Sequence, residues 1–175
     1  MLERVSALKA EGIEPHLAVI IVGDDPASHV YVNSKVKTCG RLGIRSTHIA
    51  LPSSTEEATL EHHIRDLNQR EDVHGILVQS PLPPHMDEEA LTDLIAPHKD
   101  VDGFHVASAG ALMTGLPGFW PCTPHGCMKM LEDIGYNLRG KHAVVVGRSN
   151  IVGKPMAMID RKSTRLNSSH LVISY

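Results

Sequence analysis

The sequence predicts an α/β fold with a parallel sheet. Apolar runs rich in β-branched residues, at residues 16–22, 75–79 and 142–146, alternate along the chain with helix-like segments of 10 to 16 residues. This alternation is typical of βαβ units, in which a helix connects two parallel strands. The chain has 175 residues, which is enough to bury a core and corresponds to about one to one-and-a-half domains at roughly 150 residues each.

Five elements are expected in the first 70 residues, in this order: a helix over 1–11, a strand over 16–22, a helix over about 27–42, a strand over 44–51, and a helix ending near 70. Gly12 ends the first helix, and Gly43 follows the second, where a left-handed residue is common. Residues 24–28 (DDPAS) have the turn and cap composition that begins a helix. Ser53 and Ser54 each stand three positions before a glutamate, so overlapping capping boxes are expected to begin the third helix.

The remaining elements are expected in this order: a strand over 75–79, a proline-rich loop over 80–84, a helix from 87 to about 96, a loop over 97–103, an irregular stretch rich in Gly and Pro, a helix from 123 to near 135, a strand over 142–146, and a loop over 147–155 that begins another helix. Thr123 followed by Pro124 is a favourable N-cap with proline at the first helical position. No internal repeat is visible.

Charge and hydropathy make two partner classes unlikely from the sequence alone. The chain has 17 Lys+Arg against 20 Asp+Glu and a net charge of −3, and it lacks the basic face that nucleic-acid binding requires. No apolar run approaches the roughly 18 residues that cross a bilayer, and residues 1–4 do not begin a signal peptide. We therefore expect neither a nucleic acid nor a membrane as partner, and we expect a cytoplasmic protein.

The three cysteines do not form a disulfide framework, because they are few and odd in number. A reducing compartment fits this pattern. Cys122 and Cys127 with His125 between them resemble half of a metal site, but structural zinc needs four ligands and no second pair follows. No metal is expected.

The first candidate constellation is polar and lies on the predicted helix over 27–42. Three residues at spacings of three and four share one stripe of that helix: Ser28, Tyr31 and Lys35. A tyrosine ring and a lysine amine one turn apart offer a stacking surface and a proton-transfer group to one ligand. The alternative is an ordinary surface Tyr–Lys pair.

A second group follows the predicted strands. Gln79 ends the run over 75–79, and Asp102 lies in the loop over 97–103. Ligands of open α/β sheets collect at the carboxyl ends of the strands, so Gln79 is well placed to hold a lysine or a ligand amide. The alternative is that both side chains only satisfy loop backbone.

A third motif, VVVGRSNIVGKP over 144–155, has the order strand, glycine turn and helix start. Such a turn presents backbone N–H groups to a phosphate, and Arg148 could pair with a ribose phosphate. Ser149 and Val152 replace the second and third glycines of G-x-G-x-x-G, so the motif is weak as a general dinucleotide fingerprint.

Taken together, these stretches resemble the bifunctional methylenetetrahydrofolate dehydrogenase/methenyltetrahydrofolate cyclohydrolase family. Five ordered segments carry the resemblance: VGDDPASHVYVNSKVKTCGRLGI (22–44), GILVQSPLP (75–83), KDVDGF (99–104), PCTPHGCMKML (121–131) and GKHAVVVGRSNIVGKPM (140–156). The resemblance implies an enzyme that oxidises 5,10-methylenetetrahydrofolate with NADP, less commonly NAD, and hydrolyses the methenyl product to 10-formyltetrahydrofolate. It also implies a role in one-carbon metabolism, upstream of purine, histidine and methionine biosynthesis.

The resemblance assigns roles to four residues at the folate site. It implies that Tyr31 stacks on the folate ring system and that Lys35 is the catalytic lysine. Gln79 is expected to hydrogen-bond Lys35, and Asp102 to anchor the pterin. In the cofactor motif the resemblance implies NADP contacts from these residues: Gly147, Arg148, Ser149 and Gly153.

The resemblance also implies a domain organisation. Residues 1–122 are expected to form the folate-binding catalytic domain, with an N-terminal strand and helix of the family missing. Residues 123–159 are expected to form a linker helix and the start of a Rossmann-like NAD(P)-binding domain. From Asp160 the helical pattern is lost, so residues 160–175 are expected to be a tail unrelated to the family, artefactual or disordered.

Three further expectations concern activity and assembly. Ser80 stands where the family usually has leucine, a change expected to be minor. The family is typically homodimeric. The alternatives to an active enzyme are a fragment that keeps the folate site but cannot complete the nicotinamide site and catalysis, and an unstable product with no activity.

Short-chain dehydrogenases also use Tyr-x-x-x-Lys, but there the glycine loop precedes the pair, whereas Gly147 follows it here.

Overall fold

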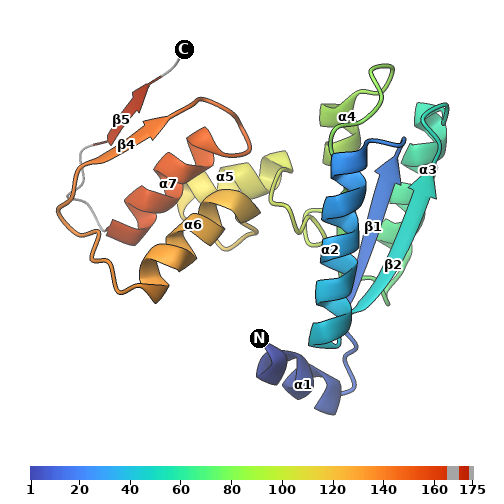
Figure 1. Cartoon of the computed structure of the whole chain (residues 1–175), viewed down its shortest axis with the longest axis horizontal. Coiled ribbons are helices and arrows are strands. Elements are labelled where there is room, and N and C mark those ends of the chain that lie inside the picture. Colours follow the sequence, from blue (N-terminus) through green and yellow to red (C-terminus); the bar gives the residue numbers. More distant parts are fainter. Residues whose placement is uncertain (165–169, 174–175) are drawn as a thin grey trace. The chain divides into compact units, whose positions relative to one another are not determined.

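The computed structural model describes residues 1–164 and 170–173, and it confirms the predicted α/β fold. The chain divides into two compact units, Met1–Asp100 and Val101–Tyr175. The first unit contains α1 (Leu2–Ala10), β1 (His16–Val22), α2 (Pro26–Leu42), β2 (Arg45–Leu51), α3 (Glu57–Gln69), β3 (Gly75–Val78) and α4 (Glu88–Asp93) (Figure 1). The second contains α5 (Val106–Thr114), α6 (Cys122–Asp133), β4 (Ala143–Val146), α7 (Gly153–Thr164) and β5 (His170–Ile173).

The sheet of the first unit is parallel, with the order β2-β1-β3. The central strand β1 pairs with β2 from His16↔Arg45 to Val22↔Leu51, and with β3 through Ile20↔Val78. The carboxyl ends of the three strands therefore share one edge of the sheet, which is the edge where α/β proteins bind ligands.

Helices cover both faces of this sheet, as is usual for parallel sheets, so that β1 is almost wholly buried while the edge strand β2 keeps exposed residues. On one face, alternate β1 residues such as Ala18 and Ile20 pack in a core with residues of α3 and α4, among them Leu60, Ile64 and Leu91. On the other face, α2 contacts β1 and β2 and buries Val32 and Cys39. The first unit thus has a core on each side of the sheet, which fixes α2 relative to the end of β3.

Helices α2 and α4 begin where the sequence predicts, but α4 ends at Asp93, before the predicted end near 96. The Asp25 carboxylate accepts the backbone N–H of Ser28 at 2.8 Å, and Gly43 ends α2 with a φ of 76°. The Asp87 carboxylate accepts the N–H of Ala90 at 3.0 Å at the start of α4. These local bonds explain why both helices begin where turn-forming residues stand in the sequence.

The predicted capping boxes of α3 are wrong. Glu56 is the N-cap of α3 and makes no side-chain cap bond. Ser53 and Ser54 lie in the turn before the helix, while the Glu57 carboxylate accepts the backbone N–H of Asp87 at 2.5 Å. The glutamate that the box needs is therefore used in a tertiary contact with the segment before α4.

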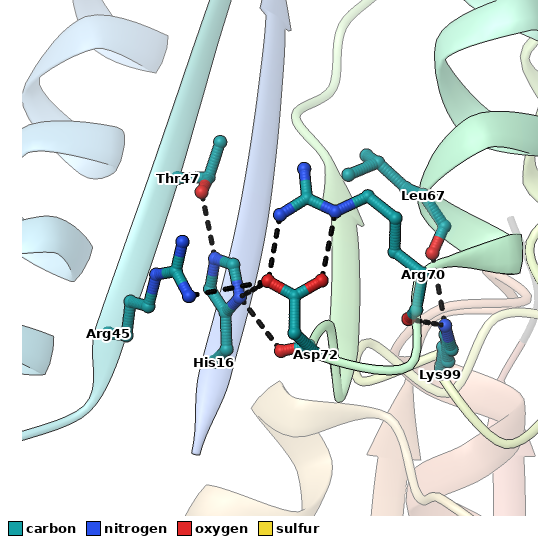
Figure 2. A network of polar contacts seen from close by, with 7 residues as sticks. All are labelled: His16, Arg45, Thr47, Leu67, Arg70, Asp72 and Lys99. Carbon is teal, nitrogen blue, oxygen red and sulfur yellow. Dashed lines mark hydrogen bonds and ion pairs between the residues drawn. The ribbon is translucent and has the colours of Figure 1, made fainter. Parts of the chain in front are cut away.

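A polar network lies at the opposite end of the sheet, where β1 and β2 begin (Figure 2). His16 is only 2% exposed, and its Nδ1 lies 2.8 Å from the Asp72 carbonyl oxygen while its Nε2 lies 2.8 Å from Thr47 Oγ1. Because a carbonyl oxygen can only accept, Nδ1 carries the proton and, in the neutral ring, Nε2 accepts from the Thr47 hydroxyl. The Asp72 carboxylate pairs with Arg70 at 2.8 Å and with Arg45 at 3.3 Å.

Three groups of this network have shifted pKa values, and the hydrogen bond to Asp72 raises the pKa of Arg70. The hydrogen bonds from Arg70 are the main reason that the pKa of Asp72 falls to about 2. Burial lowers the pKa of Lys99, whose Nζ donates to the carbonyls of Leu67, Asn68 and Arg70 at 3.0, 2.9 and 2.7 Å. Lys99 therefore satisfies carbonyls at the end of α3 that the helix itself leaves open.

The second unit has a smaller core, in which Leu112 of α5 packs with Met128 of α6 and Ile159 of α7. The strands β4 and β5 pair in parallel. The domain boundary after residue 122 stays a prediction. Helix α5, which precedes that boundary, packs with α6 and α7 in this core. This helix was not predicted, because its stretch was interpreted as irregular.

Two element ends in the second unit differ from the predictions. Helix α6 begins at Cys122 with Pro121 as its N-cap, so Thr123 is not the cap. Helix α7 continues to Thr164, so the predicted loss of helix from Asp160 is wrong. Of the predicted tail, residues 165–169 and 174–175 lie outside the described residues.

The described residues contain neither a membrane-spanning helix nor a cluster of metal ligands. No helix among them has the length and apolar character needed to cross a bilayer. Among residues 1–164 and 170–173, no three His, Cys, Asp or Glu side chains are grouped so that they could hold one metal ion.

Candidate active site

The centre of the candidate site is a hydrogen bond between α2 and the end of β3. Lys35 Nζ donates to Gln79 Oε1 at 3.1 Å, as expected from the resemblance. Both side chains are half-buried. The backbone N–H of Gln79 donates to the Ile20 carbonyl at 2.8 Å, which continues the sheet for one residue past β3. The central strand thus fixes the backbone from which Gln79 reaches the lysine.

The orientation of the Gln79 amide is determined by its neighbours. Gln79 Nε2 donates to the Ser80 carbonyl at 2.7 Å, and that oxygen can only accept. Lys35 is a donor without acceptor capacity when protonated. The NH₂ end must therefore face Ser80 and the oxygen must face Lys35, which fixes an assignment that X-ray density alone seldom settles.

Ser28 supports the same carbonyl from the start of α2. Its side chain is 4% exposed, and its hydroxyl donates to the Ser80 carbonyl at 3.3 Å. This oxygen accepts from both Ser28 and Gln79, so both of its lone pairs are used. Ser28, predicted on the same helix stripe as Lys35, therefore lies with the lysine at one site.

Tyr31 lies one turn before Lys35 on α2 and is 64% exposed. An exposed ring beside the Lys35–Gln79 pair has a face available for stacking on a planar ligand. The first unit alone therefore brings together three of the four predicted folate residues: Tyr31, Lys35 and Gln79.

Asp102 belongs to the second unit, just past the division of the chain, and is half-buried. The next residue explains the local backbone. Gly103 has a φ of 72°, and a Cβ there would lie 2.6 Å from the carbonyl carbon of Trp120. The Cys122 thiol also donates to the Val101 carbonyl at 3.3 Å. The Asp102 segment is thus held against the start of α6.

The cofactor motif forms the predicted turn from β4 into α7. Gly147 has a φ of 135°, which favours glycine. A Cβ on Gly153 would lie 2.5 Å from the Gly147 carbonyl oxygen and 3.0 Å from the Arg148 nitrogen. The start of α7 therefore approaches the turn closely, and this close approach requires glycine at 153. Gly153 thus permits the helix–strand contact that a glycine usually permits in dinucleotide-binding turns.

Ser149 acts within this turn. Its Oγ accepts the backbone N–H groups of Val152 at 3.1 Å and Gly153 at 3.2 Å. These two amides are engaged by the serine, so the expectation that the turn presents free N–H groups to a phosphate is wrong for them. The Ser149 hydroxyl keeps its own proton, and the Arg148 side chain is exposed; both can donate to a phosphate.

Sequence reasoning missed the groups that hold Gln79 in place. The Ser80 carbonyl has no sequence signal, because any residue supplies a backbone oxygen. Glu88 was also missed, although its carboxylate accepts from the Ser80 hydroxyl and from the backbone N–H of Leu82. Its acidic character at the start of α4 was the only available signal, and that character is explained equally well by helix capping.

Comparison with known proteins assigns both parts of the chain to one family. Residues 1–102 match the family model for the catalytic domain of tetrahydrofolate dehydrogenase/cyclohydrolase. Residues 121–170 match the model for the NAD(P)-binding domain of the same family. The second match confirms the predicted start of an NAD(P)-binding domain, and it extends beyond Ile159, where the resemblance was expected to end.

Similar proteins cover the same region. The "Bifunctional protein FolD" of Variovorax paradoxus (strain S110) is 64% identical over 156 residues, which are 89% of this chain and 55% of that protein. The crystal structure of the bifunctional FolD from Campylobacter jejuni has a TM-score of 0.92 and 45% identity, over 99% of this chain and 62% of that one. The Trypanosoma brucei enzyme, solved with NADP and an inhibitor, has a TM-score of 0.88 and 32% identity, over 98% and 59%.

This chain therefore spans about half of the length of the curated relatives that it matches. The family model of the catalytic domain alone covers more than half of the chain. By these matches and by its α/β fold, the chain belongs to the tetrahydrofolate dehydrogenase/cyclohydrolase family.

Proposed function

We propose that the chain binds tetrahydrofolate derivatives at the Lys35–Gln79 pair and catalyses two linked reactions. In the first, 5,10-methylenetetrahydrofolate is oxidised to the methenyl form with NADP. In the second, the methenyl form is hydrolysed to 10-formyltetrahydrofolate. The observation that carries the proposal is the hydrogen bond from Lys35 to Gln79 at the carboxyl end of the sheet, in a chain of this family.

The hydrolysis needs a group that manages protons near an electrophilic carbon. Water adds to the methenyl carbon and loses one proton to give a hydroxyl adduct. One carbon–nitrogen bond then breaks, the hydroxyl proton passes to the released nitrogen, and the formyl group remains on the other nitrogen. The amine of Lys35 can exchange that proton, because Gln79 holds Nζ at a defined position on α2. Tyr31 supplies an exposed ring for the pterin to stack on, and we assign to Asp102 the role of anchoring the pterin.

The oxidation needs only that the methylene carbon is held against the nicotinamide. Bound NADP supplies the ring that accepts the hydride. The turn from β4 to α7 fits a dinucleotide, because the close approach of Gly153 to Gly147 leaves no room for a side chain there. Arg148 and the Ser149 hydroxyl would meet its phosphates. The T. brucei relative was solved with NADP, which supports NADP over NAD.

Hydrolysis of 5,10-methenyltetrahydrofolate by the full 175-residue chain tests the proposal, measured against the spontaneous rate in the same buffer. We expect acceleration that is lost in Lys35→Ala and kept in Lys37→Ala, which removes an exposed lysine of the same helix. Equal turnover by folded Lys35→Ala and by the unchanged chain would refute the role of Lys35.

Thermal melting with and without folate, combined with the hydrolysis assay, distinguishes an active enzyme from a fragment that binds folate but does not catalyse the reaction. A ligand that binds only the folded state raises the melting temperature. A raised melting temperature without accelerated hydrolysis would support binding alone. NADP reduction by the chain is the corresponding measurement for the dehydrogenase reaction.

Assembly and location are part of the same proposal. We infer a homodimer from the family, which light scattering on the purified chain would test. The three cysteines are free thiols, which supports the cytoplasm, a reducing compartment, as the site of action. The product, 10-formyltetrahydrofolate, would serve one-carbon metabolism.

A further inference from the structure

We propose that Glu88 is a positioning residue for Lys35, acting through Ser80 and Gln79. The inference rests on the proposed function, because it concerns the same lysine. It adds a residue from α4 that is distant in sequence from α2 and has no place in the roles assigned above. The path of contacts lies entirely within the first unit.

The Glu88 carboxylate accepts two hydrogen bonds from the loop that follows β3. One carboxylate oxygen accepts the Ser80 hydroxyl, and the other accepts the backbone N–H of Leu82 at 3.3 Å. A carboxylate that uses both oxygens on one loop fixes that loop in position and in rotation. Ser80 is therefore held by its side chain on one side and through its backbone carbonyl on the other.

The helix that carries Glu88 is itself anchored. Leu91, one turn later, is 1% exposed and belongs to the main core. The backbone of Asp87 donates to the Glu57 carboxylate of α3 at 2.5 Å, and the Thr92 hydroxyl donates to the Glu88 carbonyl at 2.8 Å. The carboxylate thus projects from a backbone that is fixed to the core, so it can restrain the loop.

The restraint reaches the lysine through two hydrogen bonds. The Ser80 carbonyl accepts from Gln79 Nε2 at 2.7 Å, and Gln79 Oε1 accepts from Lys35 Nζ at 3.1 Å. Rotation of Ser80 away from Glu88 would turn this carbonyl away from Gln79. The glutamine amide would then lose the bond that sets its orientation, and Lys35 would lose a defined acceptor.

Two variants remove hydrogen bonds between Glu88 and the loop and leave Lys35 and Gln79 unchanged. Ser80→Ala removes the hydroxyl but keeps the carbonyl that Gln79 needs. Glu88→Gln keeps the shape but leaves one acceptor oxygen where the carboxylate has two, because its NH₂ group only donates, so it cannot accept from both Ser80 and Leu82. The matched control is Glu89→Gln, because Glu89 is exposed and shares the acidic first turn of α4. This control removes the same charge from the same helix end.

The first readout is independent of turnover. Trace acetylation of the folded chain, analysed by mass spectrometry, gives the labelling rate of Lys35 relative to Lys37. We expect this ratio to rise about threefold in Ser80→Ala and in Glu88→Gln, the effect of weakening one hydrogen bond, and to stay unchanged in Glu89→Gln. An unchanged ratio in both test variants would overturn the proposal, whether or not the chain hydrolyses folate.

The second readout is hydrolysis of 5,10-methenyltetrahydrofolate. We expect kcat to fall about three- to tenfold in both test variants while KM stays within about twofold, because the substrate contacts remain. A rise in KM with unchanged kcat would contradict positioning of the lysine and overturn the proposal. If the unchanged chain shows no hydrolysis, the proposed function fails, and the acetylation ratio alone decides the role of Glu88. Should Glu88→Gln not fold, Ser80→Ala, which removes only an exposed hydroxyl, decides it.

Discussion

Lys35 and Gln79 meet in only one orientation, with the lysine donating and the amide oxygen accepting at 3.1 Å. The Ser80 carbonyl enforces this polarity because it occupies the amino end of the same glutamine at 2.7 Å. The pair is therefore defined by three residues rather than two. Any substitution at 79 must satisfy a donor on one side and an acceptor on the other.

The first prediction concerns Gln79→Glu. This change adds a charge that attracts Lys35 but places a carboxylate oxygen against the Ser80 carbonyl, where two acceptors repel. We expect hydrolysis of 5,10-methenyltetrahydrofolate to fall at least about tenfold, because the orientation is lost. Gln69→Glu, an exposed position at the end of α3, is the control. Normal turnover in Gln79→Glu would mean that charge at 79 suffices and that amide polarity is irrelevant.

The second prediction concerns Gly153→Ala. The added Cβ would lie 2.5 Å from the Gly147 oxygen, and backbone cannot give way as a side chain can. We expect a loss of about 1–3 kcal/mol in the free energy of unfolding and weaker NADP binding. Urea unfolding and a fluorescence titration measure the two effects.

Gly126→Ala is the matched control for this substitution. Gly126 lies inside α6, and a Cβ there meets nothing within 4 Å. Alanine at this position should stabilise the helix by up to about 1 kcal/mol. If both glycine variants behaved alike, the close approach of α7 to the turn would not be the cause of the destabilisation.

The third prediction concerns stability in acid. The pKa of Asp72 is about 2 in the folded chain against an ordinary value of 3.8, so folding favours its charged form. Its contribution to stability is complete above pH 3.8 and is lost as the pH falls toward 2. Asp72→Asn should therefore lower the urea midpoint clearly at pH 7 and progressively less between pH 3.8 and 2.

Asp24→Asn serves as the control, since it removes one exposed carboxylate elsewhere in the first unit. A gap between Asp72→Asn and the unchanged chain that stayed constant from pH 7 to pH 2 would show that Asp72 acts by packing. In that case the pairing with Arg70 and Arg45 would not contribute to stability.

The fourth prediction concerns Lys99→Met. Methionine preserves the buried aliphatic length but leaves the carbonyls of Leu67, Asn68 and Arg70 without the Nζ donor. An unsatisfied buried carbonyl costs about 1–3 kcal/mol, so we expect a loss of at least that size in the free energy of unfolding. Amide hydrogen exchange should quicken first at the end of α3. Lys37→Met, at an exposed position, should change neither measurement.

Much of the first unit could be predicted from the sequence because its signals are local. Asp25 caps α2 and Gly43 ends it within the bounds that turn chemistry indicates. The contact of Lys35 with Gln79 spans 44 positions, and the family resemblance rather than the spacing predicted it. Periodicity alone placed the two residues on different elements and could not join them.

The wrong predictions arose where tertiary contacts replaced local ones. Glu57 fits a capping box in the sequence, but its carboxylate bonds the backbone of Asp87 instead. Helix α5 was missed because glycines surround it, although Gly115 ends it in the left-handed region with a φ of 78°. The His105 ring, which accepts the N–H of Ala107 at its start, is an unusual cap that residue preferences do not anticipate.

The central strand β1 runs from the polar network around His16 to the end of the sheet where the Lys35–Gln79 pair lies. The seven residues of β1 set the charged network around His16 roughly 20 Å from the end where Gln79 lies. A dye or surface tether could therefore be attached through Glu71→Cys, at an exposed position, once the exposed Cys122 and the half-buried Cys127 are replaced. The chain could then be immobilised at a point about one strand length away from the Lys35–Gln79 pair.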